Sequence, residues 1–197
     1  KLAFEQTEGM FRVLLIAAIM AAISATIGVT TLLLAGLTTI PAYGGVWLTW
    51  WLGDAVGALI VAPFIVLWVN RPTITVDPRR TYEALMVLGS ALILSIALFG
   101  GFLPPLFQNY PVAMLIMPFT MWVAFRFSSR EVSGIIILIS AVAIWGTLHG
   151  TGPFFRDSAN ESLLLLQAFM GIISAVGLIF ASLVAEARKA NEIKVLD

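Results

Sequence analysis

Apolar residues fill six long stretches of the chain, and short polar segments separate them. A helix needs about 20 mostly apolar residues to cross the hydrocarbon of a bilayer. The pattern therefore predicts an all-α, polytopic transmembrane bundle whose six spans lie near residues 11–36, 46–68, 82–99, 112–125, 132–148 and 163–184. The fourth stretch is short for a full crossing and contains Pro118, with Pro111 just before it, so we expect a kink or a tilt there.

Composition supports a membrane protein. Hydrophobic residues make up 60% of the chain and charged residues 11%, against about 45–50% and about 25% in soluble domains. The 11 basic and 11 acidic residues balance, which leaves no positive field for nucleic acid, so that partner is excluded. The chain has no cysteine and one histidine, so thiolate and multi-histidine metal sites are excluded, and we expect neither a metal nor a cofactor.

Basic residues divide unevenly between the two sides of the predicted bundle. One side holds ten of the 11, and the other holds only Arg156; the ten are Lys1, Arg12, Arg71, Arg79, Arg80, Arg126, Arg130, Arg188, Lys189 and Lys194. Because cytoplasmic loops carry the excess of Lys and Arg, both termini are predicted to be cytoplasmic. The segments around residues 38–45, 101–110 and 149–161 then face outward.

Asp54 is the only formally charged residue well inside a predicted span. A charge near the bilayer centre costs about 2.5–3.5 kcal/mol, so intramembrane ionisable residues are usually functional. Counted from Val46, Asp54 lies about 12 Å into the membrane, and it shares a helical face with Trp50 and Gly57. The alternative is that Asp54, with Gly53, caps or interrupts a helix.

Three further polar residues lie at a similar outer depth. Thr147 and His149 end the fifth span, and Gln167 lies about one turn into the sixth. The candidate ligand-binding or signalling residues are Trp50, Trp51, Asp54, Gly57, Thr147, His149 and Gln167. The alternatives are an interfacial histidine and a single interhelical hydrogen bond from Gln167.

Two tryptophans and several small residues of the spans also have candidate roles. Trp50 and Trp51 either belong to the aromatic belt at the membrane surface or line a pocket beside Asp54, and both readings stay open. The patterns Gly53-x-x-x-Gly57 and Gly171-x-x-x-Ala175 favour close helix contact. We assign helix packing to Gly53, Gly57, Pro63, Gly171 and Ala175.

The spacing of polar residues matches no catalytic arrangement. The sequence contains no Ser/His/Asp signature, no phosphate-binding glycine loop, no HExxH and no paired intramembrane aspartates. We therefore do not expect an enzyme.

After the sixth span the pattern becomes amphipathic. Leu183, Ala187, Ala190, Ile193 and Leu196 recur at intervals of three or four residues among charged ones, which predicts a helix leaving the membrane. Such a helix would transmit movement or dimer geometry, although a frayed interfacial tail remains possible. We divide the chain into a membrane domain, residues 1–185, and the start of a signalling helix, residues 186–197.

Two motifs in register carry a family resemblance. Residues 50–63, Trp-Trp-Leu-Gly-Asp-Ala-Val-Gly-Ala-Leu-Ile-Val-Ala-Pro, resemble the WW-x-GD-x-x-G-x-x-x-x-x-P pattern of bacterial membrane-associated sensor domains of the first MASE type. Residues 146–154, Gly-Thr-Leu-His-Gly-Thr-Gly-Pro-Phe, and residues 166–169, Leu-Gln-Ala-Phe, are similar to that family's GT-x-x-G-x-GPF and L-Q-x-F segments.

The resemblance implies a multi-span input module that precedes cytoplasmic output domains such as diguanylate cyclases, phosphodiesterases or histidine kinases. Family members commonly have eight spans, so this chain would hold the last six. We expect a sensory domain of the bacterial inner membrane that binds a small ligand or a membrane protein partner in its outer half. The full-length protein is expected to be a homodimer. The alternative is a small transporter or substrate-capture subunit that uses Asp54 as a proton- or cation-linked site.

Overall fold

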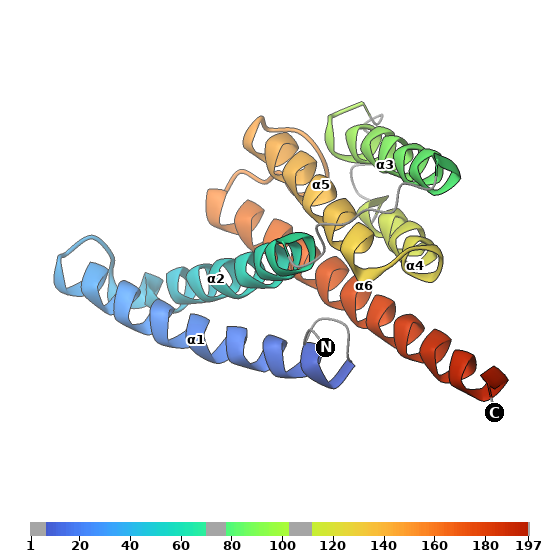
Figure 1. The fold of residues 1–197 in the computed structure, drawn as a ribbon. Coiled ribbons are helices and arrows are strands. Elements are labelled where there is room, and N and C mark those ends of the chain that lie inside the picture. The colour runs from blue at the N-terminus through green and yellow to red at the C-terminus, as the bar shows by residue number, and fades with distance from the viewer. Residues whose placement is uncertain (1–6, 70–77, 103–111, 197) are drawn as a thin grey trace.

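The computed structural model describes residues 7–69, 78–102 and 112–196, and within this part of the chain the regular structure is helical. Figure 1 shows the arrangement of its α-helices. Their bounds are α1 Thr7–Leu34, α2 Ile40–Val69, α3 Pro78–Phe99, α4 Ile116–Arg126, α5 Ser129–Leu148 and α6 Ala159–Leu196. The predicted all-α bundle is confirmed.

Five of these helices are long and apolar enough to cross a membrane. The exception is the fourth predicted span, where a short 3₁₀ helix, Val112–Leu115, leads into the 11-residue α4. Pro118 lies in the first turn of α4, where a missing backbone N–H costs little. Pro111 and most of the outer segment predicted near residues 101–110 lie outside the described residues.

The second helix begins earlier than the sequence pattern predicted. It starts at Ile40 rather than near Val46, because Pro41 suits the first turn of a helix. Asp54 is therefore 14 residues, or about 21 Å, from the first residue of α2. That places Asp54 at the middle of this 30-residue helix, while its depth in the membrane stays a prediction.

The turn between α4 and α5 follows from local sequence. Ser128 precedes α5, and the Glu131 carboxylate Oε2 accepts a hydrogen bond from the Ser128 backbone N–H at 2.9 Å. This is the reciprocal half of a capping box, in which a glutamate in the first turn satisfies a donor before the helix. This cap lets α5 begin three residues after the last residue of α4.

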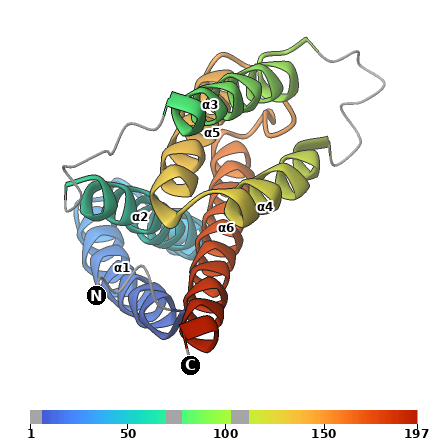
Figure 2. The ribbon, with the colours of Figure 1, turned by 45° about the vertical axis from the view of Figure 1, so that its right-hand side comes forward.

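The longest helix, α6, is central in the bundle. It contacts α1, α2, α4 and α5, while α3 packs on α5 and α4. Figures 1 and 2 show the α1–α2 hairpin on one side of α6 and α3 on the other. Two glycines of α6 face neighbours closely: an added Cβ at Gly171 would lie 3.0 Å from Val56 Cγ2, and one at Gly177 would lie 3.2 Å from Ile136 Cδ1.

Aliphatic side chains fill the interior, and large apolar side chains also cover the outside. Ile116, Ile136 and Ile173 are fully buried in the core. On α1, by contrast, Leu15 is 63% exposed and Ile27 is 64% exposed. An apolar exterior of this kind suits a bilayer, whose lipid tails are as apolar as the side chains.

Charged side chains gather at one end of the bundle. There, Arg126 pairs with Glu83 at 2.7 Å, and the Arg130 guanidinium lies 4.3 Å from the ring centroid of Trp68. At the same end Thr7, the first residue of α1, hydrogen-bonds to Glu186 of α6. The start of α1 and the exit of α6 thus lie together, as two termini on one side of a membrane require.

Two of the charges used to predict orientation, Lys1 and Arg71, lie outside the described residues. Arg156, the basic residue assigned to the other side, lies at the opposite end of the bundle, in the turn between α5 and α6. The assignment of the charged end to the cytoplasm remains a prediction.

Candidate functional site

An open groove of about 360 Å³ lies between α2 and the first turns of α6. Three residues singled out from the sequence, Trp50, Asp54 and Gln167, line it together. The full lining is Val46, Thr49, Trp50, Gly53, Asp54, Asn160 and Gln167. The groove brings together polar side chains of α2 and α6, and these side chains are more than 100 residues apart in sequence.

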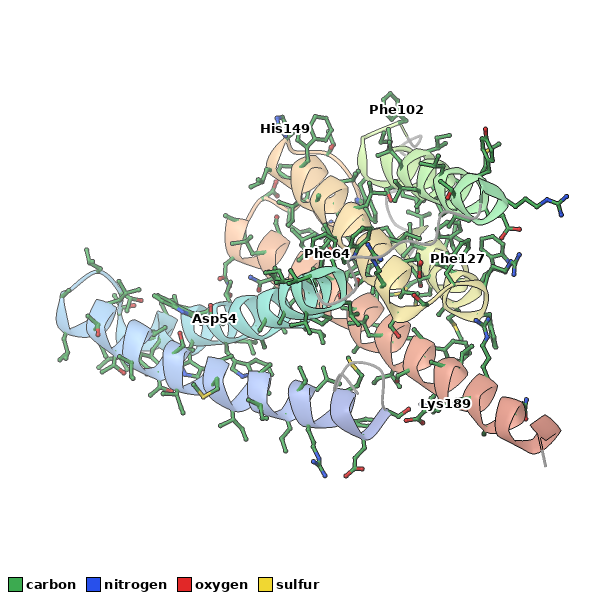
Figure 3. All side chains as sticks on the ribbon, in the orientation of Figure 1. Asp54, Phe64, Phe102, Phe127, His149 and Lys189 are labelled. Atoms are coloured by element: carbon green, nitrogen blue, oxygen red, sulfur yellow. The ribbon has the colours of Figure 1, made fainter. Side chains whose placement is uncertain are left out.

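Asp54 contributes the negative charge of the groove. Its side chain is exposed, and Ser24 Oγ of α1 donates a hydrogen bond to Asp54 Oδ2 at 2.6 Å. Figure 3 labels Asp54 on α2, beside α1. One carboxylate thus touches α1 and faces the groove toward α6.

Gln167 and Asn160 supply the polar groups of α6. An added Cβ at Gly53 would lie 2.8 Å from Gln167 Nε2, so the glycine makes room for this amide. Gln167 Oε1 is enclosed, and no donor within the described part of the chain reaches it. Asn160 Oδ1 accepts a hydrogen bond from Thr49 Oγ1 at 2.6 Å, which joins the N-terminal parts of α2 and α6.

The neighbouring tryptophans have different surroundings. Trp50 lines the groove and packs over Gly28 of α1, where an added Cβ would lie 2.7 Å from Trp50 Cζ2. Trp51 instead donates its indole N–H to Ala18 O of α1 at 2.9 Å. Its ring stacks on Trp47, with centroids 6.0 Å apart. Trp51 therefore joins α1 to α2, and only Trp50 of the pair lines the groove.

Thr147 and His149 lie elsewhere. Thr147 is buried in α5, and its hydroxyl donates to Ala143 O at 2.8 Å. His149 follows α5, with Nδ1 2.8 Å from Trp145 O and its ring 4.5 Å from the Trp145 ring. In Figure 3 His149 and Asp54 are well separated. The structure therefore does not bring these two residues to the groove.

The residues assigned to helix packing also differ from one another. Gly171 contacts α2 closely, Pro63 is fully buried, and Ala175 is half-buried against the core. An added Cβ at Gly57 would meet nothing within 4 Å. The close contact of the Gly53-x-x-x-Gly57 pattern therefore involves Gly53 and the side chain of Gln167.

The glycine-rich motif after α5 packs against the end of α3. An added Cβ at Gly146 would lie 2.2 Å from Phe99 O, and Thr151 Oγ1 donates to Phe99 O at 3.0 Å and to Gly146 O at 2.9 Å. Gly152 has φ +82°, a conformation that favours glycine. The motif therefore fixes the C-terminal end of α3 on the C-terminal end of α5.

Aromatic side chains complete this contact. Phe99 lies 5.7 Å from Phe154 and 5.4 Å from Phe169, measured between ring centroids, and Phe154 lies 4.9 Å from Phe169. Phe169 belongs to α6, two residues after Gln167. The Leu-Gln-Ala-Phe segment therefore supplies Gln167 to the groove and Phe169 to this packing contact.

Sequence reasoning missed Ser24, Thr49 and Asn160. Thr49 precedes Gly53 by four residues, so helical spacing places it on the groove face. Asn160 precedes Gln167 by seven residues, or two turns, which is the same signal. The partnership of Ser24 with Asp54 depends on how α1 packs on α2, and no spacing within one helix indicates it.

The fold and this groove define a multi-span helical membrane protein with an open polar groove between apolar helices. A family model named MASE1 matches residues 2–188, and the chain belongs to this family of membrane-associated sensory domains. No curated protein and no solved structure matches the chain.

Proposed function

We propose that this chain is the sensory input domain of a bacterial inner-membrane signalling protein. The groove between α2 and α6 receives the stimulus, and α6 passes the change to a cytoplasmic output domain such as a cyclase, phosphodiesterase or kinase. One observation carries the proposal. Asn160 and Gln167 of the groove belong to the same unbroken 38-residue helix that continues to Leu196.

The contacts at the other end of α6 support this role. Glu186 accepts hydrogen bonds from the Thr7 backbone N–H at 2.8 Å and from Thr7 Oγ1 at 2.9 Å. Arg188 donates to Phe125 O near the end of α4. An acidic side chain thus meets the start of one helix and a basic side chain meets the end of another, as helix dipoles favour. We call Thr7, Phe125, Glu186 and Arg188 the exit clasp.

Signalling of this kind is a shift between two positions of α6. A stimulus shifts the equilibrium only if it binds one position more tightly than the other. The groove and the exit clasp are polar contacts to the same helix, so a change of partner at Gln167 alters the geometry offered to Glu186 and Arg188. The output domain then responds to the position of α6.

The proposal includes an orientation, which cysteine labelling tests. The chain has no cysteine, so single substitutions give an unambiguous signal. We expect Ser158→Cys to react with an impermeant maleimide added to intact spheroplasts, and Arg79→Cys to react only after the membrane is opened. Labelling of Arg79→Cys in intact spheroplasts would reverse the orientation.

Insertions beyond the exit clasp test the output role of α6. Each residue added after Lys189 rotates the following helix by about 100°, and seven residues make nearly two turns. In the native protein, one or two residues should lock or abolish output activity, and seven should restore much of it. Equal activity across one to seven inserted residues would contradict the proposal, because a flexible tether ignores helical phase.

A further inference from the structure

The charge of the groove is unbalanced. Asp54 is the acidic residue among the side chains that line it, and none of these side chains is basic. Arg156, the basic residue of the outer turn, donates instead to the Pro153 and Phe155 carbonyls of its own loop. A carboxylate among membrane helices is costly unless a cation or donors compensate it. Ser24 supplies one donor, and a cation in the groove would supply the compensating positive charge.

The aromatic side of the groove also favours a cation. Trp50 is 38% exposed and lines the groove one helical turn before Asp54. An indole attracts a cation more strongly than other aromatic side chains do, and the attraction grows when water is excluded. A carboxylate and an indole one turn apart therefore present two features that select a positive group.

The amide of Gln167 favours a cation that carries N–H groups. Its Oε1 is enclosed, and no residue that the structure describes donates to it, which leaves a strong acceptor unsatisfied. The terminal torsion of a glutamine is soft, so the amide can turn and present Oε1 to a donor in the groove. A primary ammonium has three N–H donors and no acceptor, which matches a carboxylate and an amide oxygen.

We infer that the groove binds a small organic cation with a primary ammonium group, held by Asp54, Trp50 and Gln167. This inference rests on the proposed function, because it names the class of ligand for the same groove. The volume of about 360 Å³ accommodates a short carbon chain beside the ammonium. Two sources offer this chemistry: a free amine outside the membrane and the ethanolamine headgroup of a lipid.

The same contacts link three helices. Asp54 lies on α2 and is hydrogen-bonded to Ser24 of α1, while Gln167 lies on α6. An ammonium between Asp54 and Gln167 binds α2 to α6 directly and competes with Ser24 for the carboxylate. Binding therefore changes the contacts of the helix that leaves the membrane.

Calorimetry on the purified chain in dodecyl maltoside tests the inference with butylammonium and with 1-butanol, which has a similar shape and no charge. We expect saturable binding of butylammonium and binding of 1-butanol that is at least about tenfold weaker, the loss expected when one charge-assisted contact is removed. Asp54→Asn should weaken butylammonium binding by about tenfold as well, since the isostere keeps the shape and removes the charge.

The control variant is Asp157→Asn, which removes an exposed acidic residue outside the groove and should bind butylammonium as the wild type does. If Asp54→Asn fails to fold, Gln167→Leu carries the test, with the same expected direction. Equal binding of butylammonium and 1-butanol, or wild-type affinity in folded Asp54→Asn, would overturn the inference.

Nanodiscs separate the two sources of the ammonium. If the headgroup is the natural occupant, butylammonium should bind more weakly in equal parts phosphatidylglycerol and phosphatidylethanolamine than in equal parts phosphatidylglycerol and phosphatidylcholine, which carry the same surface charge. Equal affinity in the two bilayers assigns the groove to a free amine. The insertion series after Lys189 needs no ligand. The binding experiments therefore test the cation inference, and the insertion series independently tests the output role of α6.

Discussion

The contact between α1 and α2 differs in kind from the contact between α3 and α5. Side-chain hydrogen bonds span the first: Trp51 bonds to Ala18 O at 2.9 Å, and Trp47 Nε1 donates to Thr26 Oγ1 at 3.0 Å. The second is a backbone fit, in which Gly146 lies directly under Phe99 O and Thr151 bonds to both. The groove lies on the side of the first contact.

This difference indicates which of the two helix contacts can rearrange. A side-chain hydrogen bond between membrane helices contributes about 0.6 kcal/mol on average and can be exchanged for another partner. A close-packed backbone contact allows no such exchange, because any added volume forces neighbouring atoms to move. The α3–α5 contact therefore acts as a fixed support, and the α1–α2 contact is adjustable.

The largest expected effect comes from adding a methyl group to the fixed contact. Gly146→Ala would place a Cβ 2.2 Å from Phe99 O, so backbone must shift. We expect a loss of about 3 kcal/mol in the free energy of unfolding, measured by denaturant titration in mixed micelles. Gly57→Ala is the matched control, because its Cβ would meet no atom of the described residues within 4 Å. Equal losses of stability in both variants would contradict the idea that the α3–α5 contact is unusually close.

A matched pair of threonine substitutions compares the two contacts directly. Thr151→Val keeps the shape of the side chain and removes the hydroxyl that reaches Phe99 O and Gly146 O. We expect a loss of about 1–2 kcal/mol, because the close contact leaves the Phe99 carbonyl little freedom to find another donor. The same titration in mixed micelles measures it, and a loss near zero would show that the glycine contact alone holds α3.

The smallest effect is expected from Thr26→Val, which removes the acceptor of the Trp47 indole. A loss of about 0.6 kcal/mol in the free energy of unfolding is expected, since the indole can find another acceptor when α1 shifts slightly. The amplitude of the output response should change even so, because α1 also holds Asp54 through Ser24. If Thr26→Val lowered the free energy of unfolding as much as Thr151→Val does, the α1–α2 contact would be as fixed as the α3–α5 contact.

Much of this architecture follows from the sequence. The length of the apolar stretches gives the helices, and their alternating direction gathers the basic residues at one end. Helical spacing brings Trp50 and Asp54 to one face, and the depth of Gln167 brings it to the same level. These features depend on periodicity within a helix and on the thickness of a membrane, both of which a single sequence records.

The remainder depends on how helices pack. Adjacent residues on a helix are about 100° apart, so Trp50 and Trp51 face different neighbours, and the sequence does not tell which neighbour each one meets. The sequence predicted similar depths for His149 and Asp54, but His149 follows the last residue of α5 and its Nδ1 lies 2.8 Å from Trp145 O. The early start of α2 at Ile40 depends on a proline that also suits a loop.

The two glycines of α6 bear on how easily that helix moves. Gly171 faces Val56 of α2, and Gly177 faces Ile136 of α5, so two sides of α6 lack a side chain at their tightest contacts. Sliding usually requires one side chain to climb over another, and each such step raises an activation barrier. At these two points α6 carries no side chain of its own, and Val56 and Ile136 lie against its backbone. The proposed shift of α6 therefore meets less steric resistance at Gly171 and Gly177 than at positions that carry a buried side chain.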